Sequence, residues 1–161
     1  MSVTLAPNQS AASITGVGSV LSIGGLTGLT GTETFIVVGE VTDFKWDGGT
    51  RATTPVTNFG SGGVVQKVST TLDLGTMTFT TNRIGNNAGQ LAVIAAMNTG
   101  GAYDFKVQLP VNPNIGQTTT GDLITCSAIV TKAGGFDLSL NKTPDYTFTI
   151  DLNSYTMTAG S

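Results

Sequence analysis

The sequence contains no histidine, so the commonest general base and metal ligand of proteins is missing. A Ser-His-Asp or Cys-His catalytic arrangement is impossible, and no cysteine and histidine cluster can hold zinc. The ten acidic residues are spread singly along the chain, and no phosphate-binding loop or dinucleotide-binding glycine motif occurs. We therefore expect no catalytic residues, no cofactor and no metal, and we predict that the chain is not an enzyme.

Cysteine and charge are scarce. Cys126 is the only cysteine, which excludes an intrachain disulfide, and its apolar surroundings predict a small buried side chain rather than a reactive thiol. Charged residues are 11% of the chain, against about 25% in typical soluble domains, and the formal net charge is −3. The seven lysines and arginines are isolated, which argues against tight binding of nucleic acid through its phosphates.

So little charge has two interpretations. A surface of threonine, serine, asparagine and glycine tolerates being covered by another copy, which favours a permanent assembly. An ordinary neutral surface on a soluble β protein explains the same composition. No stretch approaches the ~20 apolar residues of a membrane span, and the N-terminus lacks the basic and apolar regions of a secretory signal, so we expect no membrane anchor.

Threonine is the most abundant residue, and glycine contributes 22 residues. Threonine is β-branched and suits a pleated, half-buried surface, so the composition predicts a mainly β protein with glycine turns. Apolar and polar residues alternate in several segments. The expected strands are 34–44, 64–72, 75–81, 103–109, 122–132, 136–140 and 145–153, with a short strand near 19–23. We expect a β-sandwich or small barrel of about seven to eight antiparallel strands with one flanking helix.

Two strand predictions are specific. Segment 34–44 is apolar on both sides, which predicts a central strand covered on both faces. Segments 64–72 and 75–81 are expected to pair around Asp73-Leu74-Gly75. In the second of them, Met77 and Phe79 alternate with threonines, which gives the strand one apolar face and one face of hydroxyls.

One helix is predicted, at about 87–98. Asn87 is a suitable N-cap with Gln90 three residues later, and glycines follow the last turn. Leu91, Ile94 and Ala95 are expected to form its apolar stripe, with Val93 and Met97 beside it. The helix carries no charge over 87–98, whereas a surface helix normally has a charged outer face, so we expect it to be covered on most sides.

The remaining segments define the expected domain organisation. Residues 1–33 are predicted to form a flexible N-terminal arm, 34–153 the folded domain, and 154–161 a tail. Residues 45–63 are predicted to be a long loop, starting near the turn signal Asp47-Gly48-Gly49. Trp46, the only tryptophan, is expected either to cover the core or to anchor an interface.

The order of these features resembles the tail tube proteins of long-tailed bacteriophages. The resemblance rests on "GSVLSIG", "FIVVGEVTDFKWDGGTRATTPVTNF", "KVSTTLDLGTMTFTT" and "NNAGQLAVIAAMNTGGAYDFKVQLP", and it extends over roughly residues 18–152. Pro55 and Val56 depart from the Ile-Asp that the family often has in the loop. The family implies a β-sandwich flanked by a helix, with six subunits closing into a ring and rings stacking into a hollow tube that delivers DNA.

The resemblance also implies partners and a location. The partners would be further copies of the chain, the tail tip and tail terminator proteins, a tape measure protein inside the tube, and double-stranded DNA that passes without tight binding. The protein would be made in the cytoplasm of the bacterial host and located in the virion tail. The inner tube of a contractile tail, a tailocin or a type VI secretion system is an alternative, and a monomeric β-sandwich binding module is less well supported.

Candidate site residues follow from this interpretation. Apolar residues of the arm and the long loop are expected to contact other subunits, and acidic residues on polar sides of strands to line the lumen. The expected contacts are Val3, Leu5, Ile14, Leu21, Ile23, Phe44, Trp46, Val56 and Phe59, and the expected lumen residues are Glu40, Asp73 and Asp104.

Overall fold

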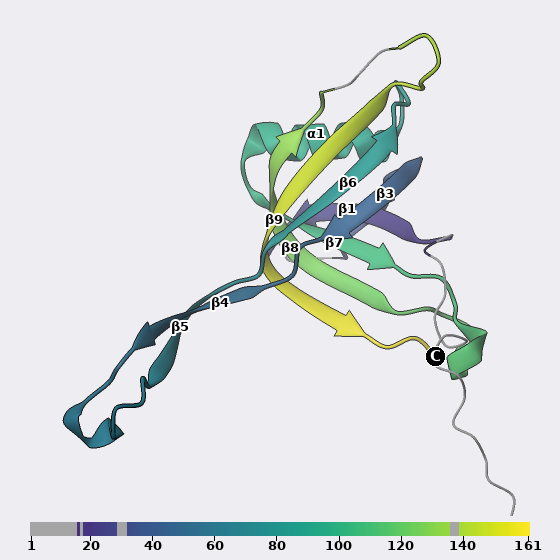
Figure 1. The fold of residues 1–161 in the computed structure, drawn as a ribbon. Coiled ribbons are helices and arrows are strands. Elements are labelled where there is room, and N and C mark those ends of the chain that lie inside the picture. The colour runs from purple at the N-terminus through teal and green to yellow at the C-terminus, as the bar shows by residue number, and fades with distance from the viewer. Residues whose placement is uncertain (1–15, 17, 29–31, 136–138) are drawn as a thin grey trace, which may run out of the picture.

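The computed structural model describes residues 16, 18–28, 32–135 and 139–161 (Figure 1). Its main element is a seven-stranded antiparallel sheet, and a separate two-stranded sheet projects from it. The strands of the main sheet are β1 (Val20–Leu26), β2 (Ile36–Val37), β3 (Val41–Trp46), β6 (Thr76–Asn82), β7 (Ala102–Gln108), β8 (Leu123–Ala133) and β9 (Asp145–Thr158). The order β2-β1-β7-β8-β9-β6-β3 leaves β2 and β3 as edges, so the described strands form no closed barrel.

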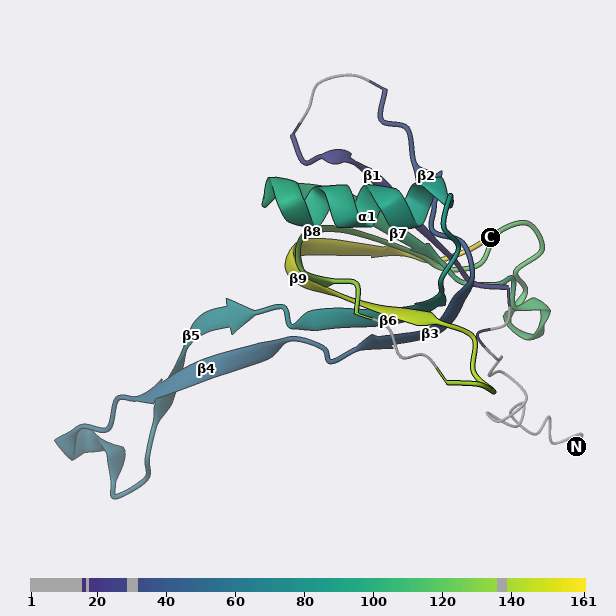
Figure 2. The same ribbon diagram turned by 90° about the horizontal axis from the view of Figure 1, so that it is seen from above.

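The main sheet bends so that its two halves face each other. β3 and β6 lie on one side of the body and β1, β7 and β8 on the other, while the long strand β9 contributes to both (Figure 2). The pairing of β8 with β9 shifts register at Ser127/Ala128 and at Val130/Lys132, and such bulges bend strands and increase their twist. The prediction of a mainly β, sandwich-like fold with one helix is confirmed.

The core lies between these halves. Phe79, Phe105 and Phe148 are fully buried, and the rings of Phe79 and Phe148 stack at 5.1 Å. The predicted alternation is observed in β6, where Met77 and Phe79 are buried and the intervening threonines are half-exposed. Full burial of a phenylalanine contributes about 1.5–3 kcal/mol, so these rings dominate the local packing energy.

The prediction of one central strand at 34–44 is wrong. The segment forms β2 and β3, which are the opposite edges of the sheet. The chain turns at Gly39 and Glu40, and Glu40 has the positive φ of 57° that ends a strand. The apolar residues of this segment are not covered on both faces of one strand. Val38 is buried in the core, whereas Ile36 and Val37 of the edge strand β2 are exposed.

The predicted pairing of 64–72 with 75–81 is also wrong. β6 pairs with β3 and β9, whereas the strand before it, β5 (Lys67–Asp73), pairs with β4 (Thr50–Pro55). The residues between β5 and β6 connect the two sheets and form no hairpin turn. Gly75, at φ 79°, lies so close to the Gly48 carbonyl that a side chain has no room, and this contact sets the crossing.

The outer ends of the chain differ from the predicted boundaries. β1 covers the region of the strand expected near 19–23 and extends to Leu26, within the segment predicted as an arm. β9 continues to Thr158, where it pairs with Leu123, within the segment predicted as a tail. Of the strand expected at 136–140, residues 136–138 lie outside the described residues, and Ser139 forms an isolated bridge with Lys142.

The helix α1 (Ala88–Thr99) begins and ends as predicted. The Asn87 side chain accepts a hydrogen bond from the Gln90 backbone N–H, and Gly100 closes the last turn at φ 71°. The helix packs along the side of the body formed by β8, β1 and β2 (Figure 2). The predicted stripe is wrong, because Val93 and Ala96 face the core while Leu91 is 45% exposed.

A buried glutamine explains why Val93 and Ala96 of the helix face the core and Leu91 does not. The Gln90 side chain is fully buried, accepts from the Ile84 N–H at 3.1 Å, and donates to the carbonyls of Gly39 at 3.1 Å and Asn82 at 2.8 Å. Asn87 adds a bond from the Gly39 N–H at 3.3 Å. These bonds hold the first helical turn against the β2–β3 turn and the end of β6, which leaves Leu91 outside.

Cys126 is buried as predicted, at 2% exposure. Burial first, and then the negative charge of Asp104, raises the pKa of its thiol to about 11. We expect the native protein not to react with a thiol reagent at neutral pH, and to release one equivalent of reactive thiol in denaturant. The measurement is a thiol titration with and without urea, and rapid labelling of the native chain would contradict the expectation.

Candidate functional site

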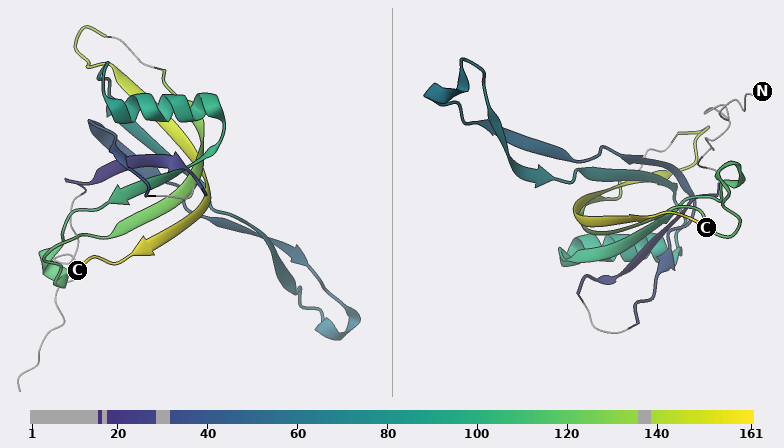
Figure 3. Two further views of the ribbon diagram at one scale, coloured as in Figure 1. Left: turned by 180° about the vertical axis from the view of Figure 1, so that it is seen from behind. Right: turned by 90° about the horizontal axis from the view of Figure 1, so that it is seen from below.

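The two-stranded sheet is the most distinctive feature of the molecule. β4 and β5 form an antiparallel ribbon that extends well beyond the body in every view (Figures 1, 2 and 3). We call residues 50–73 the ribbon. The interpretation of 45–63 as a long loop is therefore wrong over Thr50–Pro55, which is one of the two strands of the ribbon.

The ribbon has little support from its own chain. Every residue of β4 and β5 is exposed. Among the described helices and strands, β4 packs extensively only against β5, and β5 only against β4. An isolated two-stranded hairpin is marginally stable in water, and three strands or a packing partner are needed for independent stability. An exposed ribbon of this length is therefore typical of a segment that packs on another molecule.

The end of the ribbon is apolar. A short 3-10 helix, Phe59–Ser61, lies at the turn, and the Val56 N–H donates to the Gln66 carbonyl at 2.8 Å below it. The exposed apolar residues here, which we call the ribbon tip, are Val56, Phe59, Val64 and Val65. Phe59 is 112% exposed, so its ring makes no substantial contact with the rest of the chain. Clustered exposed apolar groups indicate an interaction site.

The shaft of the ribbon is basic. Arg51 and Pro55 share a face of β4 because side chains alternate along a strand, and Lys67 lies directly opposite Pro55. The ribbon holds two of the seven cationic residues and one of the ten acidic ones, so its formal charge is +1 and that of the remaining chain is −4. A basic ribbon on an acidic body favours association between copies.

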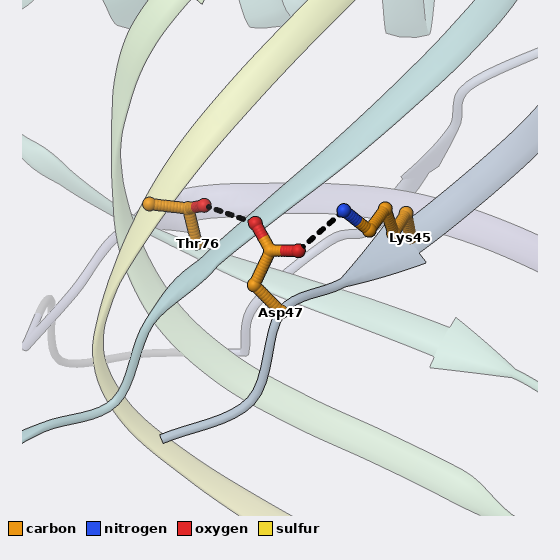
Figure 4. Close-up of polar contacts among 3 residues, drawn as sticks. All are labelled: Lys45, Asp47 and Thr76. Carbon is orange, nitrogen blue, oxygen red and sulfur yellow. Dashed lines mark hydrogen bonds and ion pairs between the residues drawn. The ribbon is translucent and has the colours of Figure 1, made fainter. Parts of the chain in front are cut away.

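Polar contacts hold the root of the ribbon (Figure 4). The Lys45 ammonium pairs with Asp47 at 2.6 Å, and the Thr76 hydroxyl donates to the other Asp47 oxygen at 3.3 Å. The Asp47 N–H donates to the Thr76 carbonyl at 3.1 Å, and the Trp46 indole N–H to the Leu74 carbonyl at 3.1 Å. These bonds tie the two strands together at the point where they leave the body.

The ion pair of Asp47 with Lys45 predicts a small pH dependence of the free energy of unfolding. The hydrogen bond and the charge of Lys45 lower the pKa of Asp47 below its ordinary value of 3.8. The stabilisation is therefore present above the unfolded-state pKa and is lost as pH falls through the lower folded-state pKa. We expect Asp47→Asn to be less acid-sensitive than the wild type in urea unfolding between about pH 5 and about pH 2. Identical pH profiles would contradict this; the exposed pair makes the expected difference small.

A groove of about 610 Å³ lies between β1 and β3, beside the first residues of β3 and not the end of β3 that leads into the ribbon. The apolar residues of its lining include Leu21, Phe44, Val107 and Leu109. Thr42 and Asp43, both exposed, also line it, from the edge strand β3. Because β3 pairs with β6 alone in the described structure, its other edge has unpaired backbone groups beside the groove.

A face of threonines runs along β6 and β9 on the side opposite the core. Thr78 lies opposite Thr149, and Thr80 opposite Thr147. On β3, Lys45 lies opposite Thr78 and Asp43 opposite Thr80, which adds one charge of each sign. The same face carries Asp151 opposite Thr76 and Asp145 opposite Asn82. It is hydrated and has more acidic than basic groups, so it has little attraction for a polyanion.

The predicted contact residues fall in different places. Leu21 and Ile23 are 3% and 1% exposed in the core of their own chain, so we withdraw them as contacts with another subunit. Phe44 and Trp46 are half-buried and pack against the same core, and the Trp46 ring also meets Tyr155 at 4.8 Å. Val56 and Phe59 are the exposed ones, at the ribbon tip. Val3, Leu5 and Ile14 lie outside the described residues.

The predicted lumen residues do not gather on one surface. Glu40 lies in the turn before β3, Asp73 at the root of the ribbon, and Asp104 in β7, where it accepts a hydrogen bond from Thr27 at 2.7 Å. Sequence reasoning recognised the threonines of β6 but not their partners on β9, because strand pairing between distant segments carries no local signal.

Within the described residues, no group of three or more potential metal-ligating acidic or cysteine side chains occurs. The same part of the chain contains no helix of the length and hydrophobicity needed to cross a membrane.

The fold is similar to that of chains in several solved tail and injection-system structures. A chain of the anti-feeding prophage tube-terminating cap superposes with a TM-score of 0.65 at 15% identity, over 99% of this chain and 100% of that one. A chain of the sheath–tube complex of the PVC extracellular contractile injection system gives 0.63 at 15% identity, over 97% and 99%. The SPP1 tail tube protein gives 0.60 at 9% identity, over 88% and 76%.

These likenesses confirm the predicted resemblance at the level of the fold: the chain shares the architecture of tail tube proteins. No protein-family model and no curated protein sequence matches it.

Proposed function

We propose that this protein is a structural subunit of a tail tube, in which six copies close into a ring and rings stack into a hollow tube that delivers phage DNA. The observation that carries the proposal is the ribbon, whose apolar tip and basic shaft are exposed and have little packing support within the chain. The shared fold with tube-forming assemblies supports the same conclusion.

The proposal includes partners and a location. Copies of the chain are the main partner, with a tail terminator and a tail tip protein at the ends of the tube, and a tape measure protein and double-stranded DNA inside it. The assembled protein is then part of a virion tail, after synthesis in the bacterial cytoplasm. The likeness to chains of the anti-feeding prophage and PVC assemblies favours one alternative, the inner tube of a contractile system.

The proposal is tested by the concentration dependence of self-association. Sedimentation velocity of the purified chain should show a ring-sized species, and larger polymers, that grow with protein concentration at the expense of the monomer. A monomer that persists up to millimolar concentration would overturn the proposal and favour the monomeric binding module.

We assign the threonine face to the channel wall. Replacing Thr78 and Thr149 with lysine should then make assembled tubes retain double-stranded DNA, because a cationic wall binds phosphates in a salt-dependent way. The measurement is co-sedimentation of tubes with linear DNA at low and high salt. Lysines at the exposed positions Asn98 and Thr99, in the last turn of α1 and away from β6 and β9, are the matched control. Equal retention by both variants would contradict the assignment.

A further inference from the structure

We propose that the groove between β1 and β3 is the binding site for the ribbon tip of a second copy of this chain. The inference rests on the proposed function, and it names where one subunit binds the next.

The groove and the ribbon tip have matching chemistry. Val41, Phe44 and Leu109 are half-buried in their own chain and supply apolar surface within a groove of about 610 Å³. This volume is inside the range of about 300–1,000 Å³ that proteins use to hold compact groups. The ribbon tip offers Phe59 and three valines without a partner in the chain. Aromatic side chains that enter apolar pockets are the usual anchors of protein interfaces.

The ribbon of the same chain does not reach the groove. The groove is lined by Val41–Phe44 of β3, whereas the chain enters the ribbon after Trp46, at the other end of that strand. From there the ribbon extends away from the body in all views (Figures 1, 2 and 3). A ribbon tip that occupies the groove must therefore belong to another copy.

Charge complementarity favours the same occupant. Asp43 lines the groove and Glu40 lies immediately before the lining residue Val41, so the β3 side of the groove is acidic. Lys67 lies opposite Pro55 directly behind the ribbon tip, and Arg51 lies on the same face nearer the root. When the ribbon tip occupies the groove, the basic face of the ribbon turns toward the acidic β3 side of that groove. This attraction aligns the ribbon and speeds the association of the two copies.

The two surfaces are different and share no residues, so the contact is head-to-tail. A head-to-tail contact leaves one free ribbon and one free groove after each addition. Such contacts generate closed rings or open filaments, and not closed two-fold dimers. The inference thus supplies one of the two contacts that the proposed tube needs, since closed rings that also stack require a second, different contact.

The test is disulfide trapping in assembled protein, with Phe59→Cys and Thr42→Cys combined in one chain. Cys126 stays buried and does not compete. After mild oxidation of tubes seen by electron microscopy, we expect a ladder of reducible multimers on a denaturing gel. Each single variant should give dimers at most. Phe59→Cys with Thr158→Cys, an exposed threonine of β9 outside the groove lining, is the matched control pair.

The outcomes separate this inference from the proposed function. Tubes without a ladder, or an equal ladder from the control pair, would overturn the groove assignment and leave the tube proposal intact. A ladder from Val3→Cys with Thr42→Cys, in place of the Phe59 pair, would assign the groove to the N-terminal arm and also overturn it. Absence of any assembly by the unmodified chain would contradict both.

A charge exchange gives an independent measurement if the cysteine variants do not fold. Arg51→Glu with Lys67→Glu should raise the protein concentration needed for assembly about tenfold or more at low salt, because close charge pairs across interfaces couple strongly. Adding Glu40→Lys and Asp43→Lys to the same chain should restore assembly. If assembly returns in the fourfold variant, the result supports the groove as the binding site of the ribbon tip. If the fourfold variant folds but does not assemble, the groove assignment is overturned.

Discussion

A chain whose ribbon is replaced by a two-residue Asn-Gly turn is expected to fold normally and to lose all assembly. The replacement removes residues 50–73, and Gly49 and Leu74 are close enough to be joined because Gly49 lies against the Asp73 carbonyl. β4 and β5 pack mainly against each other, so the core loses no buried side chain. Thermal unfolding should keep the same midpoint within a few degrees, while electron microscopy shows no tubes.

The boundaries of this deletion matter. Removing 45–63 would delete Trp46, which packs on the core and bonds to the Leu74 carbonyl, and would leave β5 without its partner strand. A loss of assembly in that variant would therefore report misfolding as well as loss of contact. The 50–73 replacement separates the two effects, and normal tubes from it would contradict the role of the ribbon.

A single substitution tests the same point with a matched control. Phe59→Ser should raise the concentration needed for assembly roughly thirtyfold or more, corresponding to the loss of about 2 kcal/mol that defines an interface anchor. Leu140→Ser is the control, since Leu140 is 105% exposed on a different loop, compared with 112% for Phe59. An equal effect from both substitutions would indicate a general effect of surface hydrophobicity and not a specific contact.

The second large effect is expected in stability. Gln90→Leu keeps the size of a fully buried side chain but deprives the Ile84 N–H and the carbonyls of Gly39 and Asn82 of their bonds to it. An unsatisfied buried polar group costs about 1–3 kcal/mol, so we expect a loss of about 3 kcal/mol or more in the free energy of unfolding. For a chain of this size the melting temperature should fall by roughly 10 °C.

The control for this prediction is Gln108→Leu. Gln108 also donates to backbone carbonyls, to Gly121 at 2.7 Å and more weakly to Asp122 at 3.3 Å and Leu109 at 3.4 Å, but its side chain is half-buried. In the Gln108→Leu variant, water can hydrogen-bond to the carbonyls that lose the glutamine. The loss in the free energy of unfolding should therefore stay at about 1 kcal/mol. Urea unfolding of the two variants measures the difference, and equal costs would show that the Gln90 contacts do not hold the helix in place.

Local patterns predicted β6 and the helix well. The alternation of Met77 and Phe79 with threonines identified β6 and its two faces, and Asn87 and Gly100 marked the ends of the helix. These signals lie within a few residues of each other, and their physical causes are local, namely side-chain period and the unpaired groups of helix ends.

Long-range arrangement was not predictable from the same patterns. Nothing in Thr50–Pro55 distinguishes a projecting strand from a loop, because the segment is polar and ends at a proline. The connection between β5 and β6 depends on the approach of Gly75 to Gly48, which are distant in sequence. Gln90 has the pattern of a surface glutamine, and its burial follows from carbonyls supplied by two other segments.

The candidate site was predicted in part. The apolar residues Val56 and Phe59 were predicted to contact another subunit, and the structure exposes both; the contact itself stays a prediction. The groove was not foreseen, because β1 and β3 come together through their separate pairings with β7 and β6. Leu21 and Ile23 were misassigned, since an apolar residue in a weakly patterned segment suits a core and an interface equally well.

The most direct test of the account is an electron cryo-microscopy reconstruction of the purified chain at high concentration. The account predicts stacked rings around an open channel, with each ribbon projecting onto another copy and the threonine face of β6 and β9 toward the channel. A compact single-chain particle at every concentration, with the ribbon folded against its own body, would contradict it.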